Sequence, residues 1–131
     1  MYKRVSIILF VLLFSNLMSQ NSVEYFGHRG CRGLYPENTI IGFKKAIDLG
    51  VDGIEWDVVV NADKQLIISH EPYIDSSYCS IPKEIKLSTF NQNIYNMSLN
   101  ELKKYDCGIK GNKNFPSQKK IASTKPSFKE A

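Results

Sequence analysis

The sequence predicts an α/β protein, and three observations in its first half support this class. A short apolar run, residues 23–26, has the character of a strand and leads into a glycine-rich turn, residues 27–39. An amphipathic segment, residues 40–50, then has apolar side chains at helical spacing. A β-branched apolar run, residues 54–60, follows and predicts a second strand. Since α/β proteins place chemistry where a strand ends and a loop begins, the turn is the first candidate for a site.

The helix is predicted from its two ends and its apolar face. A side-chain oxygen of Asn38 or Thr39 can accept a hydrogen bond from the free amides of the first turn. Gly50 is placed to end the helix in the left-handed conformation. We expect the helix to be scaffold, with an apolar stripe that comprises Ile40, Phe43, Ala46 and Ile47.

The turn before the helix carries residues suited to a phosphate. Its glycines let the backbone turn sharply and approach a ligand closely. Arg29 and Arg32 are cations whose planar guanidinium groups suit bidentate phosphate contact. His28 stands at the strand end, and Glu37 could hold an arginine in place or bind a cation. A structural or solvated role for the histidine and arginine is the alternative at this point.

The second strand carries two carboxylates, Glu55 and Asp57, which lie two residues apart and therefore on one face of a strand. Among apolar neighbours two such charges repel and are costly unless a cation neutralises them. All-oxygen ligation suits Mg²⁺ or Ca²⁺ better than Zn²⁺. The pair thus predicts a divalent-metal site, and the alternative is an exposed strand face with both side chains solvated.

A second histidine, His70, ends the next apolar run, residues 65–69. The two runs are too close in sequence for a parallel pair with a crossover helix, so we expect a hairpin. If Val60 pairs with Gln65, the register brings Glu55 opposite His70. A slip of one residue would turn the histidine to the other face.

In order and spacing, these residues resemble the signature of the glycerophosphodiester phosphodiesterase family. The matching motifs are His28-Arg29-Gly30, Pro36-Glu37-Asn38-Thr39, Glu55-x-Asp57 and His70. The family usually has Asp after the second histidine, where this chain has Glu71. The resemblance implies a TIM-type (β/α)8 barrel and a metal-dependent phosphoric diester hydrolase. Its expected reaction converts a small glycerophosphodiester to glycerol 3-phosphate and an alcohol, in lipid and glycerol metabolism.

Phosphodiester cleavage sets the expected roles of these residues. The reaction needs a cation and an arginine to offset phosphoryl charge, a base to activate the attacking oxygen and an acid to protonate the departing alkoxide. The expected set is catalytic His28 and His70, substrate-binding Arg29, metal-binding Glu55 and Asp57 for Ca²⁺ or Mg²⁺, and supporting Glu37 and Asn38.

The length of the chain limits how much of a barrel it can form. Such barrels need ~250 residues, whereas this chain has 131. We therefore expect residues 21–131 to be the N-terminal part of a catalytic domain, with an unpaired sheet edge and an uncovered core. The family's further acidic ligand, from a later strand, has no clear counterpart before Ala131. This chain alone is expected to be poorly active or inactive.

Residues 1–20 have the layout of a secretory signal peptide. A basic start at Lys3 and Arg4 precedes an apolar core, residues 5–14, and a small polar stretch. The apolar core is too short for a bilayer span of ~20 residues, so we expect export to the periplasm or medium and no stable span after cleavage. The remainder has 15 basic and 13 acidic side chains and no basic tract that would indicate nucleic-acid binding.

None of the three cysteines lies in a C-x-x-C pair, so a zinc or redox motif is not indicated. In an exported protein Cys79 and Cys107 could form a disulfide. Spacing alone does not determine the pairing. Cys31 would then be the odd cysteine, close to the site.

Residues 71–111 have no sustained period apart from a short helix at 98–105, with Ser98 as its cap and Glu101 three residues on. We expect a cap or lid over the site, and a flexible linker is the alternative. Residues 112–125 are expected to be a loop with solvated lysines: Lys113, Lys119, Lys120 and Lys125. Packing of the cap is favoured by its aromatic residues: Tyr73, Tyr78, Phe90, Tyr95 and Tyr105.

Two rival functions remain open at this stage. One is a catalytically inactive exported fragment or binding module that keeps the strand-helix unit as a surface. The other is a related phosphodiesterase for lysophospholipids or sphingolipids, since the same residues suit any phosphodiester. The Asn- and Ser-rich segment before residue 111 favours a soluble substrate over a lipid.

Overall fold

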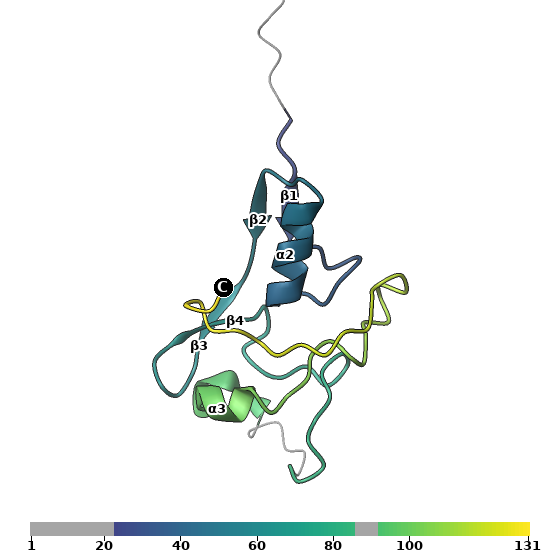
Figure 1. Cartoon of the computed structure of the whole chain (residues 1–131). Coiled ribbons are helices and arrows are strands. Elements are labelled where there is room, and N and C mark those ends of the chain that lie inside the picture. Colours follow the sequence, from purple (N-terminus) through teal and green to yellow (C-terminus); the bar gives the residue numbers. More distant parts are fainter. Residues whose placement is uncertain (1–22, 86–91) are drawn as a thin grey trace, which may run out of the picture.

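The structure, a computed structural model, describes residues 23–85 and 92–131. The predicted signal peptide, residues 1–20, lies outside the described residues. The described elements are two pairs of strands and three short helices (Figure 1). In chain order they are β1 (Phe26–His28), α2 (Ile40–Asp48), β2 (Gly53–Glu55), β3 (Val58–Val60), β4 (Leu66–Ile68), the 3-10 helix η2 (Ile94–Asn96) and α3 (Leu99–Leu102).

The first three elements form a β-α-β unit. β1 and β2 pair in parallel, with Phe26 opposite Gly53 and His28 opposite Glu55. Helix α2 connects them and lies beside the pair in Figure 1. This confirms the predicted alternation of strand, helix and strand. The first strand begins at Phe26 rather than Val23, so His28 belongs to the strand and the turn starts at Arg29.

Helix α2 begins as predicted. Thr39 is its N-cap, and its Oγ1 accepts a hydrogen bond from the amide of Gly42 at 3.1 Å. Gly50 follows the helix with φ +79°, as expected. Of the predicted apolar stripe, Phe43 and Ala46 are buried, whereas Ile47 is 64% exposed. The sheet beside α2 has only two strands and therefore covers a narrow face of the helix.

The second predicted strand is in fact two strands in different sheets. The chain leaves the first sheet after Glu55 and re-forms as β3, which pairs with β4 in an antiparallel hairpin. Val60 lies opposite Leu66 rather than Gln65, so the predicted register was wrong by one residue. The turn explains this, because Asn61 closes it: its amide donates to the carbonyl of Gln65, and its side-chain oxygen accepts from the Gln65 amide.

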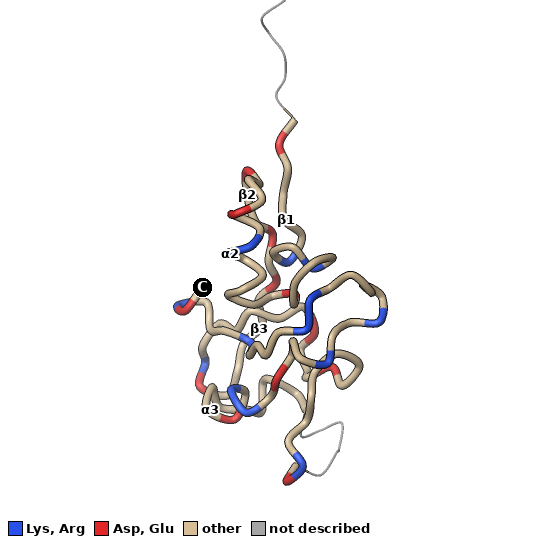
Figure 2. The backbone as a smooth tube through the Cα atoms, turned by 45° about the vertical axis from the view of Figure 1, so that its right-hand side comes forward, with Lys and Arg blue, Asp and Glu red and all other residues tan. Residues whose placement is uncertain are grey.

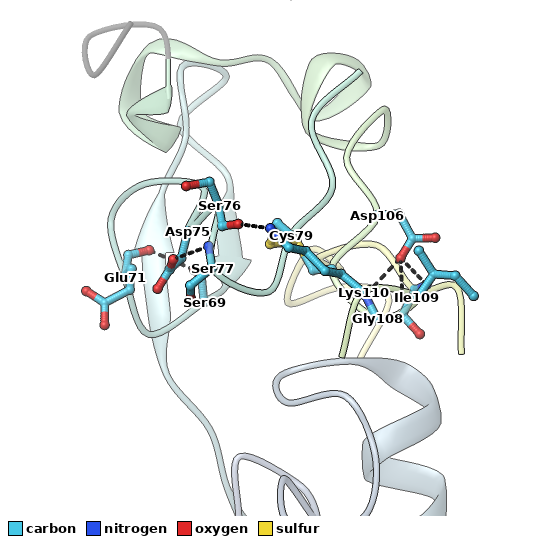
Figure 3. The surroundings of a disulfide bond; sticks show 12 residues. Ser69, Glu71, Asp75, Ser76, Ser77, Cys79, Asp106, Gly108, Ile109 and Lys110 are labelled. Atoms are coloured by element: carbon cyan, nitrogen blue, oxygen red, sulfur yellow. Dashed lines mark hydrogen bonds between the residues drawn. A yellow bond between two sulfur atoms is a disulfide. The ribbon is translucent and has the colours of Figure 1, made fainter. Parts of the chain in front are cut away.

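The described residues of the segment 71–111 pack around a hydrophobic cluster that also includes Ile67 of β4. The predicted disulfide between Cys79 and Cys107 is present in it (Figure 3). Helix α3 has the expected capping box of Ser98 and Glu101, although it is shorter than predicted. The buried members of the cluster are Ile67, Ile74, Tyr78, Cys79, Ile94, Met97, Leu102, Tyr105 and Cys107.

The prediction that the aromatic residues of this segment pack holds for some of them only. Tyr78 and Tyr105 are buried, whereas Tyr73 and Tyr95 are exposed. Phe90 lies outside the described residues.

The last 25 residues run back across the molecule, shown in yellow in Figure 1. The amide of Lys119 donates to the carbonyl of Leu34, and the amide of Ile68 donates to the carbonyl of Pro126. This segment thus joins the turn before α2 to strand β4. It is irregular and carries several lysines (Figure 2).

Apolar side chains remain exposed along the strands, as expected for two narrow sheets. They include Phe26, Val58 and Leu66, each between 44% and 60% exposed. Within the described ranges no helix has the length and hydrophobicity needed to cross a membrane.

The contact between Gly108 and the C-terminal segment gives a test of this packing. A Cβ at Gly108 would lie 1.9 Å from the carbonyl oxygen of Ile121 and 2.9 Å from Cγ of Pro36. We expect Gly108→Ala to lower the free energy of unfolding in urea by about 3 kcal/mol, the upper end of overpacking costs. Gly33→Ala is the control, because nothing lies within 4 Å of its added Cβ. Equal stability of the two variants would contradict this packing.

Candidate functional site

Arg29 is the centre of the candidate site and joins three carboxylates. Its backbone amide donates to Oε2 of Glu55 at 3.1 Å. Its side-chain Nη1 donates to Oε1 of Glu37 at 2.8 Å. Its Nε lies 3.3 Å from Oδ2 of Asp57. The structure therefore brings together four of the predicted site residues, and it confirms that Glu37 pairs with an arginine of the turn.

The local sequence forces the turn that places Arg29. Arg29 has φ +53° and Gly30 has φ +87°, so two successive residues adopt the left-handed region. A Cβ at Gly27 would lie 2.3 Å from the carbonyl oxygen of Gly30, which shows how closely the backbone folds on itself. The carbonyl of Arg29 accepts from the amide of Asn38 at 3.0 Å and closes the loop.

Asn38 orients Asp57 instead of capping the helix. Its Nδ2 donates to Oδ2 of Asp57 at 2.9 Å, and its Oδ1 lies 3.5 Å from the Asp57 amide. Asn38 is fully buried with φ +52°. Asn38 was expected to support the site, and these contacts show how it does so: it holds the carboxylate of Asp57 at the break between β2 and β3.

The carboxylates of Glu55 and Asp57 reach the same turn by a route that differs from the prediction. They do not share a strand face, because the chain leaves the sheet between them. Both nonetheless contact Arg29, one through its backbone and one through its side chain. Their proximity therefore comes from the turn and not from strand alternation.

The two histidines lie at two different strand ends. His28 Nε2 is 3.8 Å from Oε2 of Glu55, and its side chain is 58% exposed. His70 follows β4, where its Nδ1 lies 2.6 Å from Oε1 of Glu71. The observed pairing ends with Val58 opposite Ile68, one residue out of the predicted register, so the predicted pairing of Glu55 with His70 was wrong. The end of β4, which carries His70, contacts the site through the backbone: the amide of Ser69 donates to the carbonyl of Asp57 at 2.9 Å.

The charge of Arg29 is stabilised by its partners. Burial alone would lower the pKa of the guanidinium, but the hydrogen bond and charge of Glu37, with the charge of Asp57, raise it. Nε is buried and has no hydrogen-bond partner among the described residues, although it lies within ion-pair distance of Asp57. The guanidinium is therefore held mainly through Nη1 and stays charged.

The donor set is compatible with part of a site for a hard cation. The contacts of Glu55 and Asp57 within residues 23–85 and 92–131 fall on Oε2 and Oδ2, which leaves Oε1 and Oδ1 for a ligand. In the same ranges no three His, Cys, Asp or Glu side chains are arranged to hold a metal. Two carboxylates can contribute to Mg²⁺ or Ca²⁺ binding when water or further oxygen ligands complete the shell.

Sequence reasoning missed Lys125, which was expected on the surface. The residue is only 2% exposed, and Nζ lies 5.7 Å from the centre of the Tyr78 ring. Burial lowers the pKa of Lys125 to about 8, more than nearby carboxylates raise it. The charges that act on it are those of Glu37, Asp75, Glu71 and Arg29. No pattern in the loop could have identified it, because a lone lysine between a threonine and a proline carries no burial signal.

Sequence reasoning also missed Asn112. Its Nδ2 lies 3.5 Å from Oε2 of Glu37, whose other oxygen holds Arg29. The two residues are 75 positions apart, so only the tertiary fold could reveal the contact. The C-terminal segment thus contacts the site through Glu37.

Residues 28–130 match the model of the glycerophosphoryl diester phosphodiesterase family. The chain is 35% identical over 92 residues to a glycerophosphodiester phosphodiesterase of Caldanaerobacter subterraneus subsp. tengcongensis, a match that covers 70% of this chain and 34% of the relative. It is 50% identical over 48 residues to a glycerophosphodiester phosphodiesterase of Bacillus altitudinis, which covers 37% of this chain and 20% of the relative. The chain belongs to the glycerophosphoryl diester phosphodiesterase family.

Comparison with solved structures supports the same family. A Silicibacter pomeroyi protein assigned to the glycerophosphoryl diester phosphodiesterases aligns with a TM-score of 0.74 and 28% identity, over 85% of this chain and 40% of that one. An Oleispira antarctica phosphodiesterase in complex with the product sn-glycerol-3-phosphate aligns with a TM-score of 0.58 and 25% identity, over 81% and 37% of the two chains. These likenesses confirm the predicted fold class, a part of a (β/α) barrel. The chain spans about a third or less of the length of these curated relatives.

The buried ammonium of Lys125 predicts a pH dependence of stability. Below pH 8 the lysine is charged in both the folded and unfolded chain, and its burial opposes folding. Between about pH 8 and its ordinary pKa of 10.5 the unfolded chain binds more protons, so stability rises with pH. We expect Lys125→Met to be more stable than the wild type at pH 7 and the difference to shrink toward pH 10.5.

Urea unfolding at a series of pH values measures this difference. Lys113→Met, at an exposed position, is the matched control and should show no such trend. A stability difference for Lys125→Met that does not change with pH would contradict the buried position.

Proposed function

We propose that the protein containing this chain is a divalent-metal-dependent phosphodiesterase that hydrolyses glycerophosphodiesters to glycerol 3-phosphate and an alcohol. The observation that carries the proposal is the convergence of Glu55, Asp57 and Glu37 on Arg29, beside His28. Each of these residues belongs to the motifs of the family. Family membership and the product named for the Oleispira antarctica phosphodiesterase support the substrate class.

Arg29 is the proposed phosphate ligand. A guanidinium has five N–H donors, and the described hydrogen bonds use only the one to Glu37. Because Glu37 and Asp57 hold the group in place, the remaining donors are oriented before substrate arrives. A pre-oriented guanidinium loses little rotamer entropy on contact with phosphoryl oxygens.

Glu55 and Asp57 are the proposed ligands of Ca²⁺ or Mg²⁺. When bound, such a cation offsets negative charge on the phosphoryl oxygens. The hydrogen bonds from Arg29 and Asn38 fix one oxygen of each carboxylate. Asn38 is therefore proposed as a positioning residue for Asp57.

His28 and His70 are the proposed acid and base. Both side chains are partly exposed, at 58% and 42%, so each can exchange protons with substrate or water. Glu55 lies beside His28 and Glu71 lies beside His70, and each carboxylate can orient the ring next to it. This gives each histidine a carboxylate partner.

We also propose that residues 71–111 act as a cap beside the site and that the chain is exported. The cap is supported by the packed cluster around Tyr78 and by the approach of Tyr78 to Lys125. Export is supported by the composition of residues 1–20 and by the disulfide, because disulfides persist mainly in oxidising compartments.

The test of the function must account for the length of the chain. We would measure hydrolysis of glycerophosphocholine by the chain and by a chimaera in which residues 23–131 replace their counterpart in the Caldanaerobacter relative. We expect the chimaera to be active only with added Ca²⁺ or Mg²⁺. Replacing both Glu55 and Asp57 by Ala should lower its turnover at least a hundredfold, an order of magnitude typical for lost electrostatic stabilisation.

Asp48→Ala with Glu84→Ala is the matched control, because both carboxylates are exposed and lie outside the site. It should keep the activity and the metal response. Turnover that persists in the double variant at Glu55 and Asp57 with an unchanged metal response would refute the ligand assignment. An inactive chimaera that still binds sn-glycerol 3-phosphate would favour the binding-module alternative.

A further inference from the structure

Lys125 is a buried cation without a close counter-ion. Within the described residues no carboxylate oxygen lies within the 4.0 Å ion-pair distance of its Nζ. Its Nζ lies over the Tyr78 ring, 5.7 Å from the ring centre. A buried, unpaired charge is costly, so its presence calls for a cause.

The carboxylates that act on the pKa of Lys125 belong to both parts of the proposed site. Glu37, which holds Arg29, and Glu71, which contacts His70, both act on the ammonium. Asp75 lies a few residues after Glu71, on the stretch that leads to Cys79 (Figure 3). Burial raises the pKa of the Tyr78 hydroxyl, the same three carboxylates raise it further, and Arg29 lowers it. The carbonyl of Pro126, the residue after Lys125, accepts from the amide of Ile68 at 2.8 Å, so the backbone beside Lys125 lies at the strand end that leads to His70.

The charge balance of the turn indicates what the ammonium faces. Three carboxylates contact Arg29 there: Glu37 and Asp57 contact its guanidinium, and Glu55 contacts its backbone amide. An incoming phosphate would therefore be repelled by a surplus of negative charge. A metal ion bound by Glu55 and Asp57 would offset the charge of those two carboxylates but not that of Glu37. A second protein cation on the side of Glu37 would offset it there.

We propose that Lys125 is a second phosphate-binding residue, which contacts the phosphoryl group of the substrate or product opposite Arg29. This inference rests on the proposed function and assigns a residue to its phosphate site. The competing role, a structural counter-ion for Glu37, Glu71 and Asp75, is disfavoured because none of them is within ion-pair distance.

The test measures binding of two probes, sn-glycerol 3-phosphate and inorganic phosphate, to the full chain by calorimetry at pH 7 with Ca²⁺ present. We expect Lys125→Met to weaken both probes by about tenfold to a hundredfold, as for the loss of one charge-assisted hydrogen bond. Lys125→Arg should retain part of the affinity. Lys113→Met removes the same charge from an exposed position and should change the affinity less than twofold.

Thermal unfolding of the same variants separates binding from folding. An unchanged or raised Tm of Lys125→Met together with weaker binding supports the proposal. A lowered Tm with unchanged affinity would identify a structural counter-ion and overturn it, as would loss of affinity for sn-glycerol 3-phosphate alone or no binding by the wild type. Arg29→Gln tests the proposed function separately: retained affinity in that variant would contradict the assignment of Arg29 and leave that of Lys125 standing.

Discussion

The ion pairs of Arg29 are the interaction on which the rest of the site depends. Through its backbone and side chain this residue contacts the end of β2, the break before β3 and the loop before α2. Its carbonyl also accepts from the backbone amide of Asn38, and the side-chain amide of Asn38 in turn orients Asp57. Loss of the guanidinium would leave Glu37 buried without its partner, which is costly. Three segments of the chain are thus positioned around one charged residue.

This arrangement is obtained at the expense of backbone strain. Arg29 and Asn38 both adopt the left-handed region, which costs a non-glycine residue about 1–2 kcal/mol. Each charge-assisted hydrogen bond of the network contributes about 1.5–3 kcal/mol, so the contacts of Arg29 and Asn38 offset the strain. Strained residues held by strong polar contacts are characteristic of functional sites, and here they lie in the turn that carries the family motif.

The sequence predicted those features that depend on residues close to each other in the chain. The cap at Thr39, the left-handed Gly50 and the capping box of α3 depend on neighbouring residues, and these predictions were confirmed. The register of the hairpin was missed because Asn61 closes the turn with its side chain. Tertiary contacts were beyond the sequence: nothing in the loop marks Lys125 as buried, since its burial depends on segments more than 40 residues away.

The central proposal is that Glu55 and Asp57 hold a divalent metal ion with His28 and His70 on either side of the bound substrate, close to that ion. The most direct measurement is NMR of the chain with histidine side chains labelled, during titration with Mn²⁺, whose unpaired electrons broaden nearby signals. The account predicts that both histidine signals broaden together at stoichiometric Mn²⁺ and that replacing Glu55 and Asp57 by Ala abolishes the effect. Broadening of one histidine alone, or broadening that survives in the double variant, would contradict it.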